Sequence, residues 1–215
     1  MAGLRPRAAG RVRVSVVVPC APRHVALLEP LMALLDRQTS RPDEIVVAGA
    51  IPRLSARSFP IRVAPTEPRA NAARNRNAAT ARATGDVVLY QDADDVPHPQ
   101  RVEIVRRLFE RFDVDHLMHA FVHATHPTAS WTASRYDVET IHRLARYHRY
   151  AFEVGLTNGN PAVRRTITST VRWPEDRRIG EDVAFNIAAC ARSRSSVVLR
   201  APLLLYRQHL SATSV

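Results

Sequence analysis

Hydrophobic positions in the first half of the chain follow two alternating patterns. Short runs rich in valine and isoleucine predict buried strands, whereas leucines and alanines spaced three and four residues apart predict helices. The expected strands are 12–19, 43–48, 61–64 and 87–91, and the expected helices are 25–37, 71–83 and 100–112. This alternation is typical of an α/β fold with a mainly parallel central sheet and helices on both faces. Ligands of such folds bind beyond the carboxyl ends of the strands.

The pattern changes after residue 112 and indicates a mixed α+β half. We expect strands at 116–123, 130–136 and 197–205, helices at 138–149 and 181–191, and a turn at 157–161. The sequence shows no internal repeat and no low-complexity linker. We therefore expect a basic tail over residues 1–12 and a single domain over residues 13–215, whose two halves are 13–112 and 113–215.

The composition of the 215 residues is that of a globular protein, with 46% hydrophobic and 24% charged residues. Its apolar runs are shorter than the roughly 18 residues of a membrane span, so we expect no integral membrane segment. The N-terminus has no secretory apolar core. The two cysteines, Cys20 and Cys190, are far apart and fit a reducing compartment. We accordingly expect a cytoplasmic protein.

The net charge of +11 raises the hypothesis of nucleic-acid binding. All 31 basic residues are arginines, and they are scattered along the chain instead of gathered in one tract. No nucleic-acid motif and no interleaving of aromatic with basic residues occurs. We therefore expect no nucleic-acid partner, and the positive charge suits a phosphate-bearing ligand equally well.

Three carboxylates follow the strand predicted at 87–91, namely Asp92, Asp94 and Asp95. Such a strand projects them from a fixed edge of the core, where they repel one another by about 1 to 4 kcal/mol per pair at about 4 Å. A bound cation would remove this repulsion, and hard oxygen ligands suit Mg²⁺ or Mn²⁺ better than zinc. The alternative is that Asp95 caps the following helix while the other two acids are solvated.

The ordered set of motifs resembles the inverting glycosyltransferases of family 2, which have the GT-A fold. The similar segments are 14–19 (VSVVVP), 34–39 (LLDRQT), 42–47 (PDEIVV), 73–77 (ARNRN), 85–89 (GDVVL), 92–95 (DADD), 159–161 (GNP), 180–182 (GED) and 206–209 (YRQH). Each segment is weak evidence alone, but their order and spacing over residues 13 to 211 are specific. The resemblance implies transfer of a sugar from a nucleotide diphosphate sugar to an acceptor hydroxyl.

On the donor side, the resemblance implies a Mn²⁺ or Mg²⁺ ion that neutralises the departing diphosphate. Asp94 would be its direct ligand, Asp92 would contact the ribose or donor sugar beside the metal, and His209 would be a third ligand. His209 is equally explained as a surface histidine. The remaining donor-binding residues would be Pro19, Arg74 and Asn75; the last two are alternatively part of a solvated helix face.

On the acceptor side, the resemblance implies that Asp182 is the general base that removes the hydroxyl proton. Glu181 would be its catalytic neighbour and would contact the acceptor, together with Gly159 and Asn160. The alternative explanation for the two acids is that they offset the dipole at the start of a helix. No enzyme nucleophile is required, because the family's single displacement inverts the anomeric centre.

Several positions on the nucleotide side depart from the family pattern. The second strand is followed by residues 48–51 (AGAI), where the family usually has an acid that reads the base. This weakens the inference of a uridine donor and leaves open a catalytically inactive nucleotide-binding or scaffold protein. The acceptor is not identified; we expect a soluble small molecule, glycan or peptide.

Two further groups of residues suggest binding but are better explained by packing. His116, His119, His123 and His126 would share a zinc-binding stripe on a helix, but their segment is predicted to be a strand that divides them between two faces. Trp131 and Trp173 could stack on a sugar ring, although a core position is the favoured interpretation.

Overall fold

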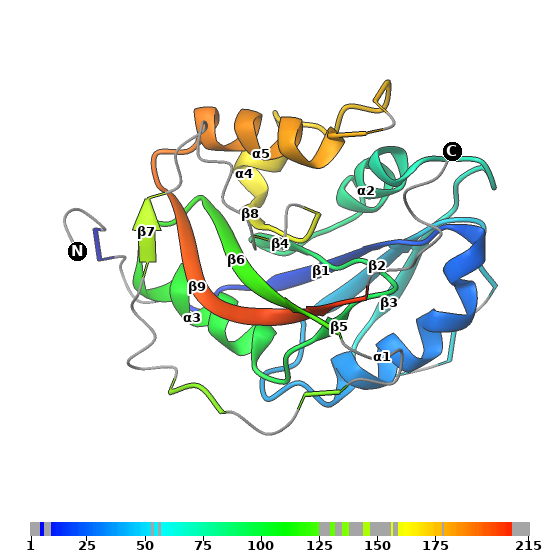
Figure 1. Cartoon of the computed structure of the whole chain (residues 1–215), viewed down its shortest axis with the longest axis horizontal. Coiled ribbons are helices and arrows are strands. Elements are labelled where there is room, and N and C mark those ends of the chain that lie inside the picture. The colour runs from blue at the N-terminus through cyan, green and yellow to red at the C-terminus, as the bar shows by residue number, and fades with distance from the viewer. Residues whose placement is uncertain are drawn as a thin grey trace.

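The structure is a computed structural model of the whole chain, and it describes residues 5–6, 10–52, 54–55, 57–124, 130–131, 135–137, 144–146, 156, 159–177 and 179–207. Within these residues one nine-stranded sheet has the order β3-β2-β1-β4-β8-β6-β9-β5, and β7 pairs with β9 outside this path. Figure 1 shows the sheet in the middle of the molecule, with helices above and below it. The predicted α/β fold class is confirmed.

The first half of the chain forms the parallel part of the sheet. Its strands are β1 (Val14–Pro19), β2 (Glu44–Ala48), β3 (Ile61–Ala64) and β4 (Val87–Tyr90). All adjacent pairs among them are parallel. The helices of this half are the 3₁₀ helix η1 (Pro22–Leu27), α1 (Leu28–Asp36), α2 (Ala72–Thr80) and α3 (Arg101–Arg111). Every residue of β1, β2 and β4 is buried, which is why these strands read as continuous apolar runs.

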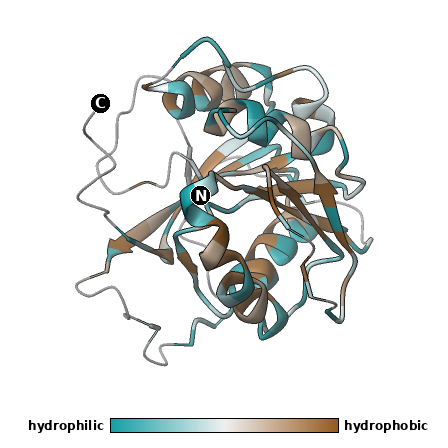
Figure 2. Ribbon diagram, turned by 90° about the vertical axis from the view of Figure 1, so that its right-hand side faces the viewer, coloured by the Kyte–Doolittle hydropathy of each residue, from teal (hydrophilic) through white to brown (hydrophobic). Residues whose placement is uncertain are grey.

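Two hydrophobic cores lie on opposite faces of the sheet. Successive side chains of a strand point to opposite faces, so Val16 and Val18 pack with α1 and α3, while Val17 packs with α2 and α5. Figure 2 shows the mainly hydrophobic strands between helices that contain both hydrophobic and hydrophilic residues. This three-layer arrangement leaves the carboxyl ends of β1 and β4 at one edge of the sheet.

The second half of the chain extends the sheet with mixed pairing. It contains β5 (Val96–Pro97), β6 (His116–His123), β7 (Leu144–Arg146), β8 (Ala162–Arg164), α4 (Arg165–Thr168), α5 (Glu181–Arg192) and β9 (Ser196–Tyr206). Strand β8 lies antiparallel between β4 and β6. The residues just before β8 are therefore brought beside the end of β4, where the acidic cluster lies.

The structure corrects two predictions for this half. The helix expected at 138–149 is wrong for its described part, because Leu144–Arg146 pair antiparallel with β9. The described residues of the strand expected at 130–136 lie in no strand, and Trp131 instead donates a hydrogen bond to the backbone oxygen of Val96. The short elements β5, β8 and α4 were not predicted.

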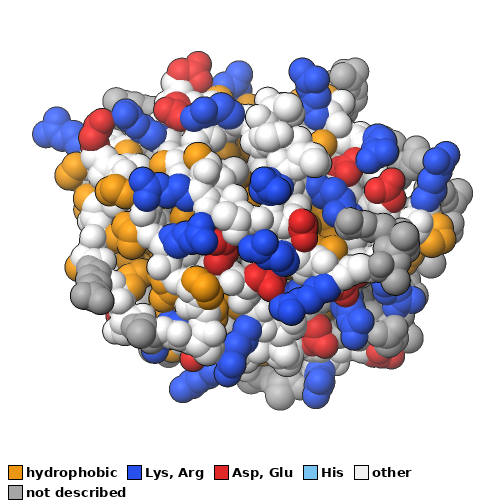
Figure 3. All heavy atoms as spheres, turned by 180° about the vertical axis from the view of Figure 1, so that it is seen from behind, with side chains coloured by type: hydrophobic (Ala, Val, Ile, Leu, Met, Phe, Trp, Pro, Cys, Tyr) orange, Lys and Arg blue, Asp and Glu red, His pale blue; other side chains and the backbone are white. Residues whose placement is uncertain are grey.

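The distribution of charged side chains on the surface agrees with the scattering of arginines along the sequence. Figure 3 shows basic side chains spread over the rear face and interspersed with acidic ones. No helix in the described part of the chain is long and apolar enough to cross a membrane.

Candidate active site

The acidic cluster lies at the carboxyl end of β4, as the sequence predicts. The side chains of Asp92 and Asp94 are 24% and 21% exposed, whereas Asp95 is buried. Burial raises the pKa of Asp95 well above its ordinary value, and the charges of Asp92 and Asp94 raise it further. On the other side of Asp94, its Oδ2 atom lies 3.7 Å from Nε2 of His24. Three carboxylates so close together make this edge of the sheet a candidate cation site.

The structure does not support the capping interpretation of Asp95. Helix α3 begins at Arg101, and its N-cap residue, Gln100, makes no side-chain capping bond. The carboxylate of Asp95 instead accepts hydrogen bonds from the backbone N–H of Arg207 and from Nδ2 of Asn160, both at 3.2 Å. Asp95 therefore connects the end of β4 to the segments that precede β8 and follow β9.

Asn160 fixes the geometry of the acidic cluster from a buried position. Its Oδ1 accepts the backbone N–H of Asp92 at 2.6 Å, and its Nδ2 donates to Oδ2 of Asp92 at 3.2 Å. The neighbouring Gly159 leaves room for a close approach, because a Cβ atom there would lie 2.7 Å from Oδ2 of Asp92 and 2.9 Å from Nη2 of Arg76. The two residues predicted on the acceptor side thus lie directly against the predicted donor side.

Arg76 is the functional candidate that the sequence analysis missed. Its Nη2 atom lies 2.8 Å from Oδ1 of Asp92, and its Nη1 atom lies 3.5 Å from Oε1 of Glu181. The side chain is only 5% exposed and its guanidinium lies 4.3 Å from the ring centroid of Trp173. Trp173 in turn stacks on Phe185, with ring centroids 4.0 Å apart. Trp173 is therefore a core residue, as expected.

The predicted catalytic acids occupy the first turn of α5. Helix α5 follows Gly180, whose φ of +74° is the left-handed conformation that glycine adopts most easily. Both Glu181 and Asp182 are partly exposed, and Oδ1 of Asp182 accepts the backbone N–H of Val183. Through Arg76, Glu181 is linked to the acidic cluster at the end of β4. Donor-side and acceptor-side acids that are distant in the sequence thus meet at one place.

A second buried arginine, Arg101, lies behind the cluster in the core. Its hydrogen-bond acceptors are the backbone oxygens of Tyr90 and Asn160, Oε1 of Gln91 and Nε2 of His119. Because Nε2 of His119 accepts this bond, the neutral ring carries its proton on Nδ1, which lies 2.9 Å from the backbone oxygen of Ala120. Burial lowers the pKa of Arg101 to about 9, which still leaves it positively charged at neutral pH.

The remaining donor-side residues lie around the ends of β1 and α2. Pro19 ends β1 and is buried. Asn75 is also buried; its Nδ2 donates to the backbone oxygen of Cys20 and its Oδ1 accepts the hydroxyl of Thr66. Asn75 therefore ties the segment after β1 to the segment after β3, next to the predicted donor side.

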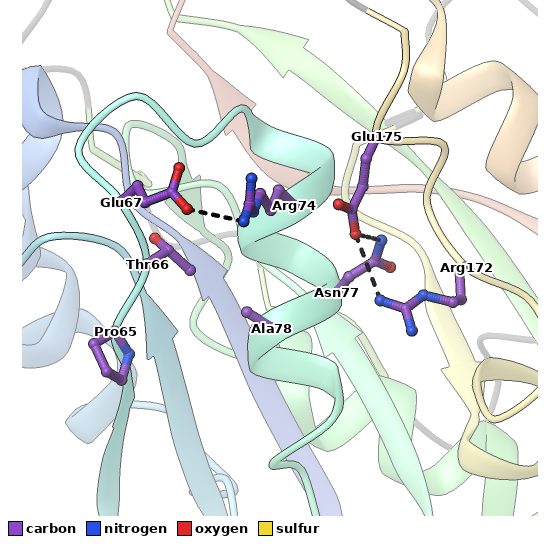
Figure 4. Close-up of a pocket in the computed structure, with 8 residues that line it drawn as sticks. All are labelled: Pro65, Thr66, Glu67, Arg74, Asn77, Ala78, Arg172 and Glu175. Atoms are coloured by element: carbon purple, nitrogen blue, oxygen red, sulfur yellow. Dashed lines mark hydrogen bonds and ion pairs between the residues drawn. The ribbon is translucent and has the colours of Figure 1, made fainter.

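Arg74 does not join the other predicted residues in the acidic cluster. It is exposed on the opposite side of α2, 3.0 Å from Oε1 of Glu67. Figure 4 shows it lining a separate pocket of about 650 Å³, across α2 from Arg172 and Glu175. His209, the predicted third metal ligand, lies outside the described residues.

The histidines of β6 do not form a metal site in the structure. His116 is buried next to Asn186 of α5, whereas His119 faces Arg101 on the other side of the sheet. His126 lies outside the described residues. More generally, no group of three His, Cys, Asp or Glu side chains that could hold a metal occurs among the residues that the structure describes. Among the described residues, a cation at Asp92 and Asp94 would thus have only these two acids as direct side-chain ligands, and the predicted third ligand, His209, lies outside them.

The donor atoms present at the acidic cluster nevertheless fit a divalent ion. They are partly exposed carboxylate oxygens, the ligand type that Mg²⁺ and Mn²⁺ prefer. The pKa of Asp95 is raised chiefly by burial and further by the charges of Asp92 and Asp94, so negative charge is concentrated here. Within the part of the chain that the structure describes, the buried Nε atoms of Arg76 and Arg207 have no hydrogen-bond partner, which leaves donors for an anionic ligand.

Comparisons with known proteins agree with the fold. A family model described as "Glycosyl transferase family 2" matches residues 15–172. No curated protein sequence matches the chain. Among solved structures, S. aureus TarS 1-349 in complex with UDP-GlcNAc has a TM-score of 0.69 at 16% identity, covering 94% of this chain and 61% of that chain.

A second solved structure extends the comparison to another sugar nucleotide. The mannosyltransferase PcManGT from Pyrobaculum calidifontis, in complex with GDP-Man and Mn²⁺, has a TM-score of 0.58 at 18% identity. The alignment covers 93% of this chain and 57% of that chain. The chain thus spans about three fifths of TarS 1-349 and of PcManGT, and at these identities the likeness establishes the fold alone.

Proposed function

The chain belongs to glycosyl transferase family 2, and from this premise we propose that it transfers a sugar from a nucleotide diphosphate sugar to an acceptor hydroxyl, with a divalent metal ion and with inversion of the anomeric centre. The observation that carries the proposal is the meeting of two acidic groups at one edge of the sheet. Asp92 from the end of β4 and Glu181 from the start of α5 are joined there by Arg76. One group suits a metal-bound diphosphate, and the other suits a hydroxyl.

In the proposed donor site, Asp94 and Asp92 hold the divalent ion, which offsets the negative charge of the departing diphosphate. Asn160 keeps Asp92 oriented through its backbone N–H and its carboxylate. The unpartnered Nε–H groups of Arg76 and Arg207 offer additional donors to phosphate oxygens. Pro19 and Asn75 border the nucleotide side, and Arg74 would reach it only by leaving Glu67.

In the proposed acceptor site, Asp182 accepts the proton of the attacking hydroxyl. The acceptor oxygen forms a bond to the anomeric carbon as the bond from that carbon to the diphosphate oxygen breaks, so no covalent enzyme intermediate is needed. Glu181 lies beside the base and contacts the acceptor together with Gly159 and Asn160. Because Glu181 is paired with Arg76, the position of its carboxylate is restrained.

The proposal does not specify which base the donor nucleotide carries. TarS binds UDP-GlcNAc and PcManGT binds GDP-Man, so the two structural neighbours carry different bases. In this chain, the end of β2 has no acid, and a Cβ atom at Gly49 would lie 2.4 Å from the backbone oxygen of Cys20. This close backbone contact favours recognition of the base by main-chain groups instead of a carboxylate.

The test compares sugar transfer and donor hydrolysis by the wild type and by Asp182→Asn over a panel of UDP-, GDP- and dTDP-sugars with Mn²⁺. Removing a general base should lower turnover by about 100- to 10,000-fold. Asp176→Asn, an exposed acid in the loop before α5, is the matched control and should leave turnover unchanged.

Thermal unfolding with each nucleoside diphosphate, with and without Mn²⁺, separates catalysis from binding. Stabilisation that requires nucleotide and metal together would identify the base. Stabilisation without turnover on any donor would instead favour a nucleotide-binding protein that has lost catalysis. Absence of both would contradict the proposal.

A further inference from the structure

Arg76 lies between the donor-side and acceptor-side acids in a position that only a charged group could occupy favourably. It pairs with Asp92 and Glu181 while its side chain is almost fully buried. Burial alone would lower its pKa, but the charges of Asp92, Glu181 and Asp182 outweigh that effect and raise the pKa above its ordinary value. The guanidinium is therefore permanently charged.

Three parts of the fold hold this guanidinium in place. The ring of Trp173 covers one of its faces, and Trp173 is itself fixed by stacking on Phe185. Gly159 approaches so closely that any side chain there would push into the pair formed by Arg76 and Asp92. A long, flexible surface arginine would not be confined in this way, so the position of the charge is built into the fold.

We propose that Arg76 is a built-in counter-cation of the acidic cluster: it neutralises Asp92 in the metal-free protein and makes a divalent ion bind weakly unless the diphosphate arrives with it. This inference rests on the proposed metal-dependent function. An ion that arrives alone meets a carboxylate already paired with a cation and is repelled by that cation. A diphosphate adds oxygen ligands for the ion and negative charge that offsets Arg76, so metal and nucleotide should strengthen each other's binding.

The proposed role of Arg76 as a counter-cation also explains why its Nε atom has no hydrogen-bond partner within the described residues. Its Nη atoms are taken by Asp92 and Glu181, but the buried Nε–H has no acceptor within the described residues. A buried donor without an acceptor is unfavourable. A phosphate oxygen would satisfy it while the guanidinium stays in place. Arg76 is thus a positioning residue that gains an anionic partner when the donor binds.

The test measures Mn²⁺ binding in the absence of nucleotide, by the electron paramagnetic resonance signal of free Mn²⁺. The variants are Arg76→Gln, which removes the charge, and Arg76→Lys, which keeps it. One unit charge removed from within a few ångströms of a divalent ion, in a water-like dielectric, corresponds to about tenfold in affinity. We expect Arg76→Gln to bind Mn²⁺ about tenfold more tightly than the wild type, and Arg76→Lys to bind it like the wild type.

Two further variants keep the result interpretable. Arg82→Gln removes an exposed arginine just beyond the end of α2 and should leave Mn²⁺ binding unchanged. Arg76→Met keeps the packing on Trp173 and is measured alongside Arg76→Gln in case the latter unfolds. A merely structural role for Arg76 would weaken Mn²⁺ binding in both neutral variants, the opposite of the expected direction.

The same titrations are repeated with UDP and GDP. We expect the nucleotide to tighten Mn²⁺ binding strongly in the wild type and by about tenfold less in Arg76→Gln. One outcome overturns this inference alone: the wild type binds Mn²⁺ with nucleotide, but without nucleotide the neutral variants bind Mn²⁺ no more tightly than the wild type. The proposed function would then stand. If no form of the protein binds Mn²⁺ with or without nucleotide, both are overturned.

Discussion

Replacing Asn160 by alanine tests whether the acidic cluster is held by its hydrogen bonds. Asn160 is 3% exposed, and its side chain makes three hydrogen bonds, two to Asp92 and one to Asp95. The substitution leaves the backbone N–H of Asp92 without an acceptor and removes one of the donors to the buried carboxyl of Asp95. Each such loss costs about 1 to 3 kcal/mol. Because Asp92 is partly exposed and water can reach it, we expect a total of about 2 to 4 kcal/mol.

The assay is urea unfolding of the wild type and Asn160→Ala at neutral pH with a metal chelator present. The expected result is a lower midpoint at an unchanged m-value, which shows a loss of stability and not a change in the unfolded state. Asn71→Ala is the calibrating variant, because Asn71 caps α2 by accepting the N–H of Arg74 and does not contact the acidic cluster. Loss of that cap should cost about 1 kcal/mol.

The isosteric variant Asn160→Asp sharpens the test. It keeps the acceptor for the N–H of Asp92 but replaces the donor to Asp92 and Asp95 with another carboxylate oxygen. Burial and repulsion would raise the pKa of the introduced carboxyl, so the folded protein would hold its proton to higher pH than the unfolded chain. The loss of stability should therefore grow as the pH rises. A cost for Asn160→Ala no larger than that of Asn71→Ala, or a cost for Asn160→Asp that does not change with pH, would refute the reasoning.

Three further predictions follow from other parts of the structure. Folding raises the pKa of Asp95 above 3.8, so the free energy of unfolding should fall as the pH rises from about 4 through the raised pKa; Asp95→Asn should remove that part of the slope in urea titrations. Trp173→Ala removes the ring that packs against Arg76 and Phe185 and should cost about 3 to 5 kcal/mol in urea unfolding; a cost below about 1 kcal/mol would contradict the packing. Burial raises the pKa of Cys20 to about 11, so at pH 8 roughly one thiol in a thousand is ionised, and iodoacetamide should label Cys190 first in a mass-spectrometric time course; equal labelling rates would contradict this.

Strands β1, β2 and β4 were predictable because burial on both faces gives them continuous apolar runs in the sequence. The predicted ranges 61–64 and 116–123 coincide with β3 and β6, and the ranges for β1, β2 and β4 differ by one or two residues at their ends. The elements missed, β5, β8 and α4, have two to four residues. So few residues cannot display a period, and pairing with neighbours distant in the sequence decides their conformation.

The failure at 138–149 has a related cause. The leucine, alanine and arginine residues of that segment have the composition of an amphipathic helix, but the backbone of Leu144–Arg146 pairs with β9. Intrinsic helix propensity amounts to less than about 1 kcal/mol per residue. A few hydrogen bonds to the side of β9 that does not face β6 outweigh it, and the local sequence pattern contains no information about that pairing.

At the candidate site, the cluster of acids was visible in the sequence, whereas the arginines that contact it were not. A strand that runs directly into three aspartates is conspicuous, whereas one arginine among the scattered basic residues of this chain is not. The signal in the sequence that could have identified Arg76 is its position on helix α2. Arg76 lies three residues from Ala73 and three from Ala79, both buried, and so belongs to the apolar face of α2. An arginine on the apolar face of a helix needs a buried anionic partner, and that rule would have directed attention to it.

The same rule identifies Arg101, which shares the buried face of α3 with Ile104 and Val105. The two arginines thus bring positive charge to the acidic cluster from different sides, one from α2 and one from α3. The pKa of Asp95 is raised in their presence, chiefly by burial and further by the charges of Asp92 and Asp94. Carboxylates that are buried close together are unfavourable for stability. The proposed metal-bound diphosphate would contribute both a cation for these carboxylates and an anion for the two arginines.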